Sequence, residues 1–85
     1  MKKKVKSAIY LKDVQLFLDE CIRTHEPVTL LALTQDGKRN LYEGWLVVSA
    51  HWRAGTHDLR NPKNGEIRKV RDVLMFNING HPIYL

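Results

Sequence analysis

The sequence predicts an α+β protein in which one N-terminal helix packs on a small five-stranded antiparallel barrel. Apolar residues recur at helical spacing before Pro27, and short strand-like segments follow it. Asp-Gly and Asn-Gly pairs separate several of these segments, and such pairs favour the tight turns of hairpins. Successive hairpins imply antiparallel pairing, and closure into a barrel would remove the exposed sheet edges.

The helix is predicted over residues 13–25. Apolar side chains at spacings of three and four fall on one face there: Leu11, Val14, Phe17, Leu18, Cys21 and Ile22. Asp13 lies near the start, where an acidic side chain complements the free N–H groups of a helix. Pro27 disfavours helical geometry at Glu26, so the helix is expected to end before it.

The five strands are predicted at residues 28–34, 40–52, 56–60, 66–78 and 81–85. Gly44 gives the second strand a place to bend, and Pro82 suits an edge strand because it lacks a donor. The short repeat "AIYL" and "PIYL" (residues 8–11 and 82–85) suggests edge strands at the two ends of one sheet. Whether residues 5–11 form a strand or extend the helix is open at this stage.

Charge divides the chain into a basic tail, residues 1–6, and a single domain, residues 7–85. The net charge is +5, but Lys2, Lys3, Lys4 and Lys6 all lie in the tail. Without them, 10 basic residues face 9 acidic ones, so the domain itself carries only +1. A lysine tail adds weak affinity for phosphates or is a solvated terminus.

Composition predicts a cytoplasmic, non-membrane protein. The single cysteine excludes an internal disulfide. No apolar run approaches the roughly 20 residues that span a bilayer. The apolar segment "SAIYL" after the basic start is too short for a signal peptide.

The stretch "PVTLLALTQDGKRNLYEGWLVV" resembles the Sm-like branch of the small SH3-like barrels, through an apolar strand, Asp36-Gly37-Lys38 and then Gly44. The resemblance covers residues 13–85 in the order of elements and implies a barrel preceded by a helix. Gly37 and Gly44 lie further apart than in the Sm pattern. Asn79-Gly80 stands where that family has an Arg-Gly segment, so no RNA-binding residue of the family is carried over. The segment "RKVRDVLMF" is also similar to WYL domains, whose Trp-Tyr-Leu run is absent.

The predicted hairpin at residues 59–71 holds most of the remaining positive charge and is the candidate nucleic-acid site. Its cations are Arg60, Lys63, Arg68, Lys69 and Arg71. Several cations on one hairpin suit contacts with phosphates. In a regular strand Lys69 and Arg71 point one way, while Arg68 shares a face with Val70. The alternative is a solvated ribbon with cross-strand charge pairs to Asp58 and Asp72.

Aromatic side chains supply the second part of the candidate site. Bases stack on aromatic rings in proteins that bind single strands. Trp45 falls on the mixed face of its strand and is the expected stacking residue. We expect Trp52, Tyr42 and Tyr84 to lie in the core.

Metal binding and catalysis have little support in the sequence. Cys21 and His25 are four residues apart, but a structural zinc site needs two such pairs. No phosphate loop or nucleophile elbow is present, and neither Ser7 nor Ser49 has a neighbouring base with an orienting carboxylate. We therefore predict no metal, no cofactor and no enzymatic activity.

The sequence thus predicts a non-catalytic module that binds RNA or single-stranded DNA through the basic hairpin. The alternative is a protein-interaction or self-assembling module that uses exposed edge strands, with "HPIYL" at residues 81–85 as the edge.

Overall fold

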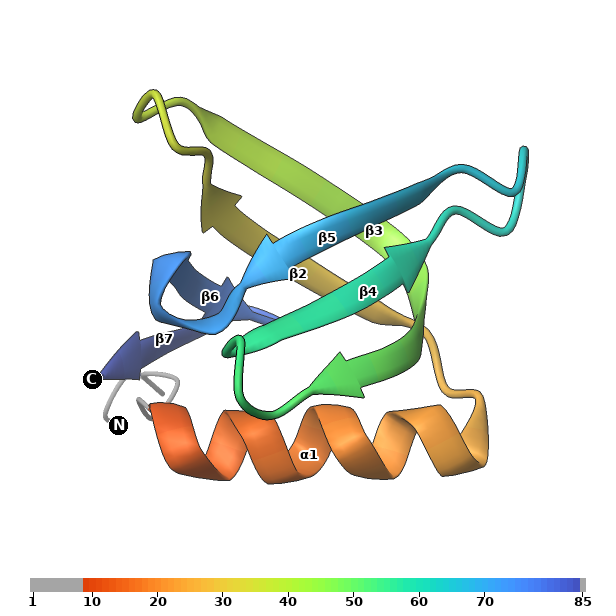
Figure 1. Cartoon of the computed structure of the whole chain (residues 1–85), viewed down its shortest axis with the longest axis horizontal. Helices are drawn as coiled ribbons and strands as arrows, with labels where there is room; N and C mark the ends of the chain where they lie inside the picture. Colours follow the sequence, from red (N-terminus) through yellow and green to blue (C-terminus); the bar gives the residue numbers. More distant parts are fainter. Residues whose placement is uncertain (1–8, 85) are drawn as a thin grey trace, which may run out of the picture.

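The computed structural model describes residues 9–84, which form one helix and a bent, mixed β-sheet (Figure 1). In chain order the elements are β1 (Ile9–Tyr10), α1 (Leu11–Thr24), β2 (Val28–Leu33), β3 (Arg39–His51), β4 (Thr56–Arg60), β5 (Ile67–Arg71), the 3-10 helix η1 (Asp72–Leu74), β6 (Met75–Ile78) and β7 (His81–Tyr84). The basic tail predicted at residues 1–6 lies outside the described residues.

Helix α1 confirms the helical pattern but begins two residues before the predicted start. It follows β1 directly, and Asp13 lies in its first turn. The helix ends where His25 adopts a left-handed conformation (φ 62°) and donates its backbone N–H to the carbonyl of Cys21 at 2.8 Å. This single bond satisfies one of the free carbonyls of the last turn. Pro27 then directs the chain into β2.

The predicted five-stranded antiparallel barrel is wrong. The strands form one seven-stranded sheet in the order β1-β7-β6-β2-β3-β4-β5, and the sheet is not closed. Its two ends, β1 and β5, are not paired with each other. The prediction failed because tight turns specify which strands are neighbours, whereas closure depends on a long-range pairing that no turn encodes.

The two similar segments near the chain ends lie side by side instead of at opposite ends of the sheet. β1 pairs with β7 in parallel, with Ile9 opposite Ile83 and Tyr10 opposite Tyr84. The two tyrosine rings are 5.7 Å apart between centroids. Because β1 covers β7, the segment predicted as a free C-terminal edge has a strand on both sides.

The long strand predicted at residues 66–78 is divided by η1. The chain turns at Asp72, whose backbone N–H donates to the carbonyl of Gly55 at 2.8 Å. Asp72 is 3% exposed, so this turn places a carboxylate inside the protein. A strand that continued through it would leave β5 and β6 in one line instead of at separate places in the sheet.

The core lies between α1 and the inner face of the sheet. In Figure 1 the helix runs across one side of the bent sheet, and its buried side chains are Val14, Leu18 and Cys21. Every strand from β2 to β6 contributes at least one of the buried apolar side chains Val28, Leu30, Ala32, Tyr42, Val47, Leu59, Val70, Met75 and Ile78. Burial of this apolar area is the main favourable contribution to folding.

Two irregularities let β3 bend around this core. Gly44 has φ 70°, and the β2–β3 register shifts beside it, where Trp45 pairs with Val28 and Glu43 with Thr29. A second shift separates Val47 from Ser49 in the pairing with β4. The bend predicted at Gly44 is therefore present, and it carries β3 from β2 to β4.

Candidate nucleic-acid interface

The cations predicted to bind nucleic acid lie on β4, β5 and the turn between them. Arg68 pairs with Leu59, which is completely buried. Because paired residues lie on the same face of a sheet, the side chain of Arg68 projects from the inner face. Lys69 pairs with Asp58, and neighbouring residues of a strand point to opposite faces. The sheet therefore separates Arg68 from Lys69, as the alternation in the sequence predicts.

A groove of about 450 Å³ runs beside the cationic strand and collects part of this set. One wall is the free edge of β5, and the other is the β2–β3 hairpin. Its lining residues are Leu33, Thr34, Gln35, Asn40, Tyr42, Thr56, Arg68, Lys69, Val70, Arg71 and Leu74. Because β5 is the last strand of the sheet, side chains from both of its faces reach this edge. The edge position thus brings Arg68 together with Lys69 and Arg71, which project from the opposite face.

The lining of the groove contains three cations and no carboxylate. Arg68 pairs with Glu66 at 2.5 Å and Lys69 with Asp58 at 3.3 Å, and the cationic side chains in both pairs are more than half exposed. The Arg68–Glu66 pair is exposed on both sides and therefore weak, whereas Asp58 in the second pair is only 18% exposed. Among residues 9–84, no carboxylate lies within ion-pair distance of Arg71. The β5 wall of the groove therefore carries two ion-paired cations and Arg71, and the other wall offers polar groups.

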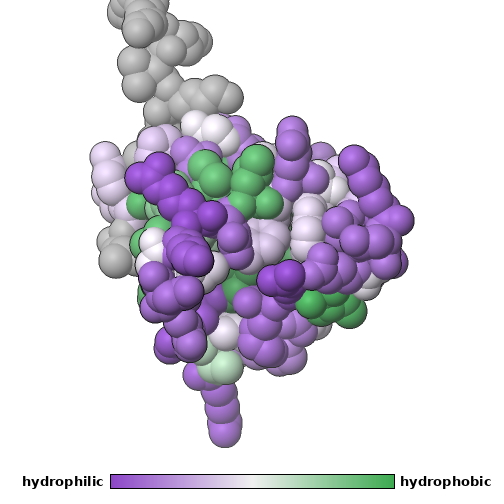
Figure 2. Space-filling model, turned by 90° about the horizontal axis from the view of Figure 1, so that it is seen from above, coloured by the Kyte–Doolittle hydropathy of each residue, from purple (hydrophilic) through white to green (hydrophobic). Residues whose placement is uncertain are grey.

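The remaining predicted residues lie outside the groove. Arg60 ends β4, and Lys63 is exposed in the β4–β5 turn. Trp45 is half-buried, packs against the core and meets the Tyr42 ring edge-on at 5.0 Å. Figure 2 shows the face opposite α1, where hydrophilic side chains cover most of the surface between smaller apolar areas.

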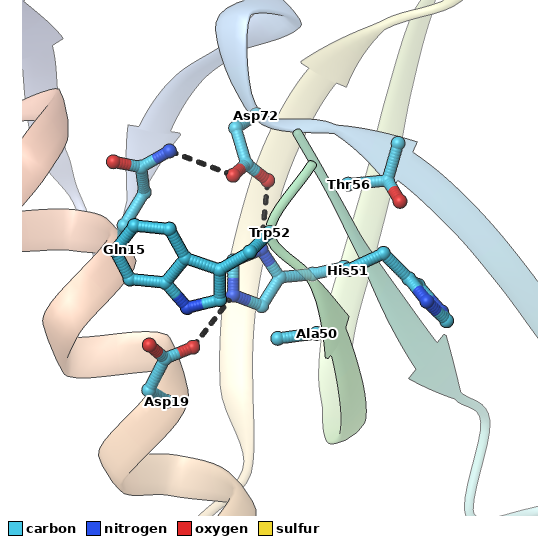
Figure 3. Close-up of a pocket in the computed structure, with 8 residues that line it drawn as sticks. Gln15, Asp19, Ala50, His51, Trp52, Thr56 and Asp72 are labelled. Carbon is cyan, nitrogen blue, oxygen red and sulfur yellow. Dashed lines mark hydrogen bonds and ion pairs between the residues drawn. The ribbon is translucent and has the colours of Figure 1, made fainter. Parts of the chain in front are cut away.

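A second polar cluster joins α1 to the sheet around the buried His57. Its imidazole lies between two carboxylates, with Nδ1 2.7 Å from Asp72 and Nε2 3.0 Å from Asp19 (Figure 3). The amide of Gln15 donates to the second oxygen of Asp72 at 2.8 Å. One chain of hydrogen bonds therefore connects α1, β4 and η1.

The geometry requires His57 to be protonated. Both ring nitrogens face carboxylate oxygens, which only accept hydrogen bonds, so both nitrogens donate. Burial alone lowers the pKa of His57, but the hydrogen bonds to Asp72 and Asp19 outweigh it and leave the pKa above the ordinary 6.5. Burial raises the pKa of Asp72, but hydrogen bonds from His57 and Gln15 bring it below 3.8.

These shifts predict that the protein is most stable in mildly acidic solution. The raised pKa of His57 gives a stabilisation that is complete below 6.5 and is lost as the pH rises through the folded pKa. The lowered pKa of Asp72 gives a stabilisation that is present above 3.8 and is lost as the pH falls through its folded value. Urea denaturation across this range should therefore give a maximum between about pH 4 and 6.5. A rise in stability from pH 6.5 to 9 would contradict the protonated cluster.

A third cluster lies on the outer face of the sheet around Asp58. His51 is 2.9 Å from one oxygen of Asp58, and Ser49 donates to the same oxygen at 2.8 Å. The hydrogen bond from His51 is the largest cause that lowers the pKa of Asp58 to about 2, despite some burial. Because the hydroxyl of Ser49 donates to the carboxylate instead of to the imidazole, this arrangement does not activate a nucleophile.

The sequence did not identify the most exposed aromatic side chain. Trp52 is 82% exposed and Tyr84 56%, so the prediction that they lie in the core is wrong; for Tyr42, 8% exposed, it is confirmed. Strand alternation placed Trp52 inside, but β3 ends at His51 and Trp52 belongs to the turn. The cluster of His57 was missed because its partners are distant in sequence, and only Asp72 in an apolar run hinted at it.

The structure adds two observations on metals and membranes. Within residues 9–84 no group of three or more His, Cys, Asp or Glu side chains is arranged to hold a metal ion. Cys21 is buried, and this burial is the largest cause that raises the pKa of its thiol. The negative charges of Glu26 and Glu20 raise the pKa further. In the part of the chain that the structure describes, no helix has the length and apolar character needed to cross a membrane.

Comparisons with models of protein families, with curated protein sequences and with solved structures gave no match. The candidate sites therefore rest on the residues of this chain.

Proposed function

We propose that the protein binds single-stranded RNA or DNA, without catalysing a reaction, along the cationic groove beside β5. The observation that carries this proposal is the grouping of Arg68, Lys69 and Arg71 in a groove whose lining has no carboxylate. Phosphate contacts supply most of the affinity of non-specific nucleic-acid binding, and a positively charged groove that follows the backbone is typical of single-strand binders.

The distribution of charge supports this location. Residues 11–27 contain two basic and four acidic side chains, whereas residues 28–84 contain eight basic and five acidic ones. The helix side is therefore net negative, −2, and the remainder is net positive, +3. A polyanion approaching the protein is drawn toward the sheet and away from α1.

The polar groups of the opposite wall suit a single strand. Thr34, Gln35 and Asn40 offer hydrogen-bond donors and acceptors across the groove from the cations.

Self-assembly along the edge of β5 or of β7 is not favoured by this arrangement. β7 is covered by β1, and the free edge of β5 is rich in cations. Antiparallel pairing of two copies centred on Lys69 would place that residue opposite itself, and like charges in this position are destabilising. Natural sheets protect their edges with lysine and other charged residues in the same way.

Charge reversal in the groove tests the proposal. Fluorescence anisotropy with labelled single-stranded RNA and DNA should show that Arg68→Glu with Arg71→Glu weakens binding at least about tenfold at low salt. The dependence of affinity on salt should also become shallower, because fewer counterions are released. These two exposed side chains are not part of the core, so the variant should keep the circular dichroism spectrum of the wild type.

The double variant Lys12→Glu with Arg23→Glu is the matched control, because it makes the same charge change on exposed positions of α1. Its affinity for the labelled RNA and DNA should stay closer to that of the wild type than the affinity of the groove variant does. Equal losses in both double variants would mean that only net charge matters, and absence of binding by the wild-type protein would refute the proposal.

A further inference from the structure

Trp52 is a large aromatic side chain that the fold leaves in solvent. It is 82% exposed in the turn after β3, although aromatic rings of this size contribute most when they are buried. Its indole lines a small depression together with Gln15, Asp19 and His57 (Figure 3). An exposed ring beside a polar depression has the form of a stacking platform with hydrogen-bonding groups at its margin.

The side chains of α1 at this margin offer acceptors. Asp19 uses one oxygen for His57, which leaves the other oxygen without a protein donor among the described residues. The amide N–H₂ of Gln15 donates to Asp72, so its carbonyl oxygen remains available to accept a hydrogen bond. Both ring nitrogens of His57 are already engaged. The hydroxyl of Thr56 lines the same depression, is buried and has no hydrogen-bond partner.

The depression and the cationic groove share one lining residue. Thr56 lines both of them. It pairs with His51 on one side and with Arg71 on the other, so these residues form one row across β3, β4 and β5. Two strand spacings, about 10 Å, separate the backbones of His51 and Arg71. A strand whose phosphate lies at Arg71 can therefore place a base on Trp52, the neighbour of His51.

We propose that Trp52 stacks one base of the bound strand and that Asp19 and Gln15 select guanine. Guanine presents two adjacent donors, N1–H and the 2-amino group, on its Watson–Crick edge. Adenine and cytosine each present one amino donor beside an acceptor, and uracil presents one N–H between two carbonyls. An edge of acceptors satisfies guanine best, because the other bases leave an acceptor facing an acceptor. This inference rests on the proposed single-strand binding.

The test compares short uridine-rich oligoribonucleotides that differ at one central position, using anisotropy with the full chain. One carries uridine there, and the others carry guanosine, inosine or adenosine. Inosine keeps the ring and N1–H of guanosine but lacks the 2-amino group, so it probes one hydrogen bond without changing the protein. Guanosine should bind about tenfold more tightly than uridine, with inosine in between.

Protein variants separate stacking from hydrogen bonding. Trp52→Ala should remove about tenfold of the affinity for the guanosine oligonucleotide, and Trp52→Phe should keep most of it because an aromatic face remains. In Asp19→Asn the amide oxygen still accepts from His57, but a donor replaces the free acceptor. This variant should lose the preference for guanosine over inosine. If it fails to fold, the inosine comparison with the wild type tests the same hydrogen bond.

Failure of this inference and failure of the proposed function give different results. If all the oligonucleotides bind equally and Trp52→Ala has no effect, the guanine site is refuted, while sensitivity to Arg68→Glu with Arg71→Glu would leave the groove intact. If the wild type binds none of them, both are refuted.

Discussion

Replacing His57 with leucine is expected to lower the free energy of unfolding by about 3–5 kcal/mol. The imidazole is 3% exposed and separates two carboxylates, so its removal leaves Asp72 buried without its charge partner. A domain of this length has a free energy of unfolding of about 4–13 kcal/mol, so this loss is a large fraction of the total stability. Urea denaturation at pH 5.5, where the cluster is fully formed, measures the change.

Two companion variants identify the cause of this loss. His51→Leu makes the same substitution at an exposed histidine that also pairs with an aspartate, and it should change stability by less than about 1 kcal/mol. His57→Leu with Asp72→Leu removes the buried charge together with its partner and should recover much of the loss, because an apolar replacement of a whole buried ion pair is often tolerated. Equal losses of stability in His57→Leu and His51→Leu would contradict a buried ion pair at His57. A double variant that is less stable than His57→Leu would contradict it as well.

Leu18→Ala is the second large effect, an expected loss of about 2–5 kcal/mol. Leu18 is completely buried where α1 packs on the sheet, so truncation removes apolar contacts and leaves a cavity. Leu16→Ala is the matched control on the same helix, because Leu16 is 62% exposed, and it should cost less than about 0.5 kcal/mol. Similar losses in both variants would mean that α1 packs through a different face.

The sequence predicted local structure well because local structure depends on nearby residues. The spacing of Val14, Leu18 and Cys21 specifies which face of α1 is buried, and all three are inside. Residues 35–37 form the loop between β2 and β3, one residue longer than the two-residue turn predicted at Asp36-Gly37, and Gly37 at its end has the positive φ (84°) that such a loop needs. The bend at Gly44 follows from the same conformational freedom.

Long-range arrangements were not accessible from the sequence in the same way. The parallel pairing of Ile9 with Ile83 joins residues from the two ends of the chain, and no turn links them. The open sheet results from the missing partner of β5, which alternation within β5 does not reveal. The contact between Asp19 and His57 likewise depends on how α1 crosses the sheet.

Three of the five predicted cations, Arg68, Lys69 and Arg71, line the candidate groove, whose shape the sequence did not predict. Alternation separates Arg68 from Lys69, which weakens a patch on the face of a sheet, but an edge strand presents both sides to one groove. Trp45 was selected as a stacking residue by its face on β3, yet it packs against Tyr42. Trp52 is the exposed tryptophan because a turn, to which strand alternation does not apply, follows His51.

The most direct test of the central claim is the mapping of a bound single strand on the protein by NMR. During titration with a short uridine-rich RNA, the backbone amide signals of Arg68–Arg71 and of Thr34 and Gln35 should shift most. The exposed face of α1 around Glu20 and Arg23 should change little. The largest shifts around Glu20 and Arg23, or no shifts at RNA concentrations that saturate the anisotropy signal, would contradict binding in the groove beside β5.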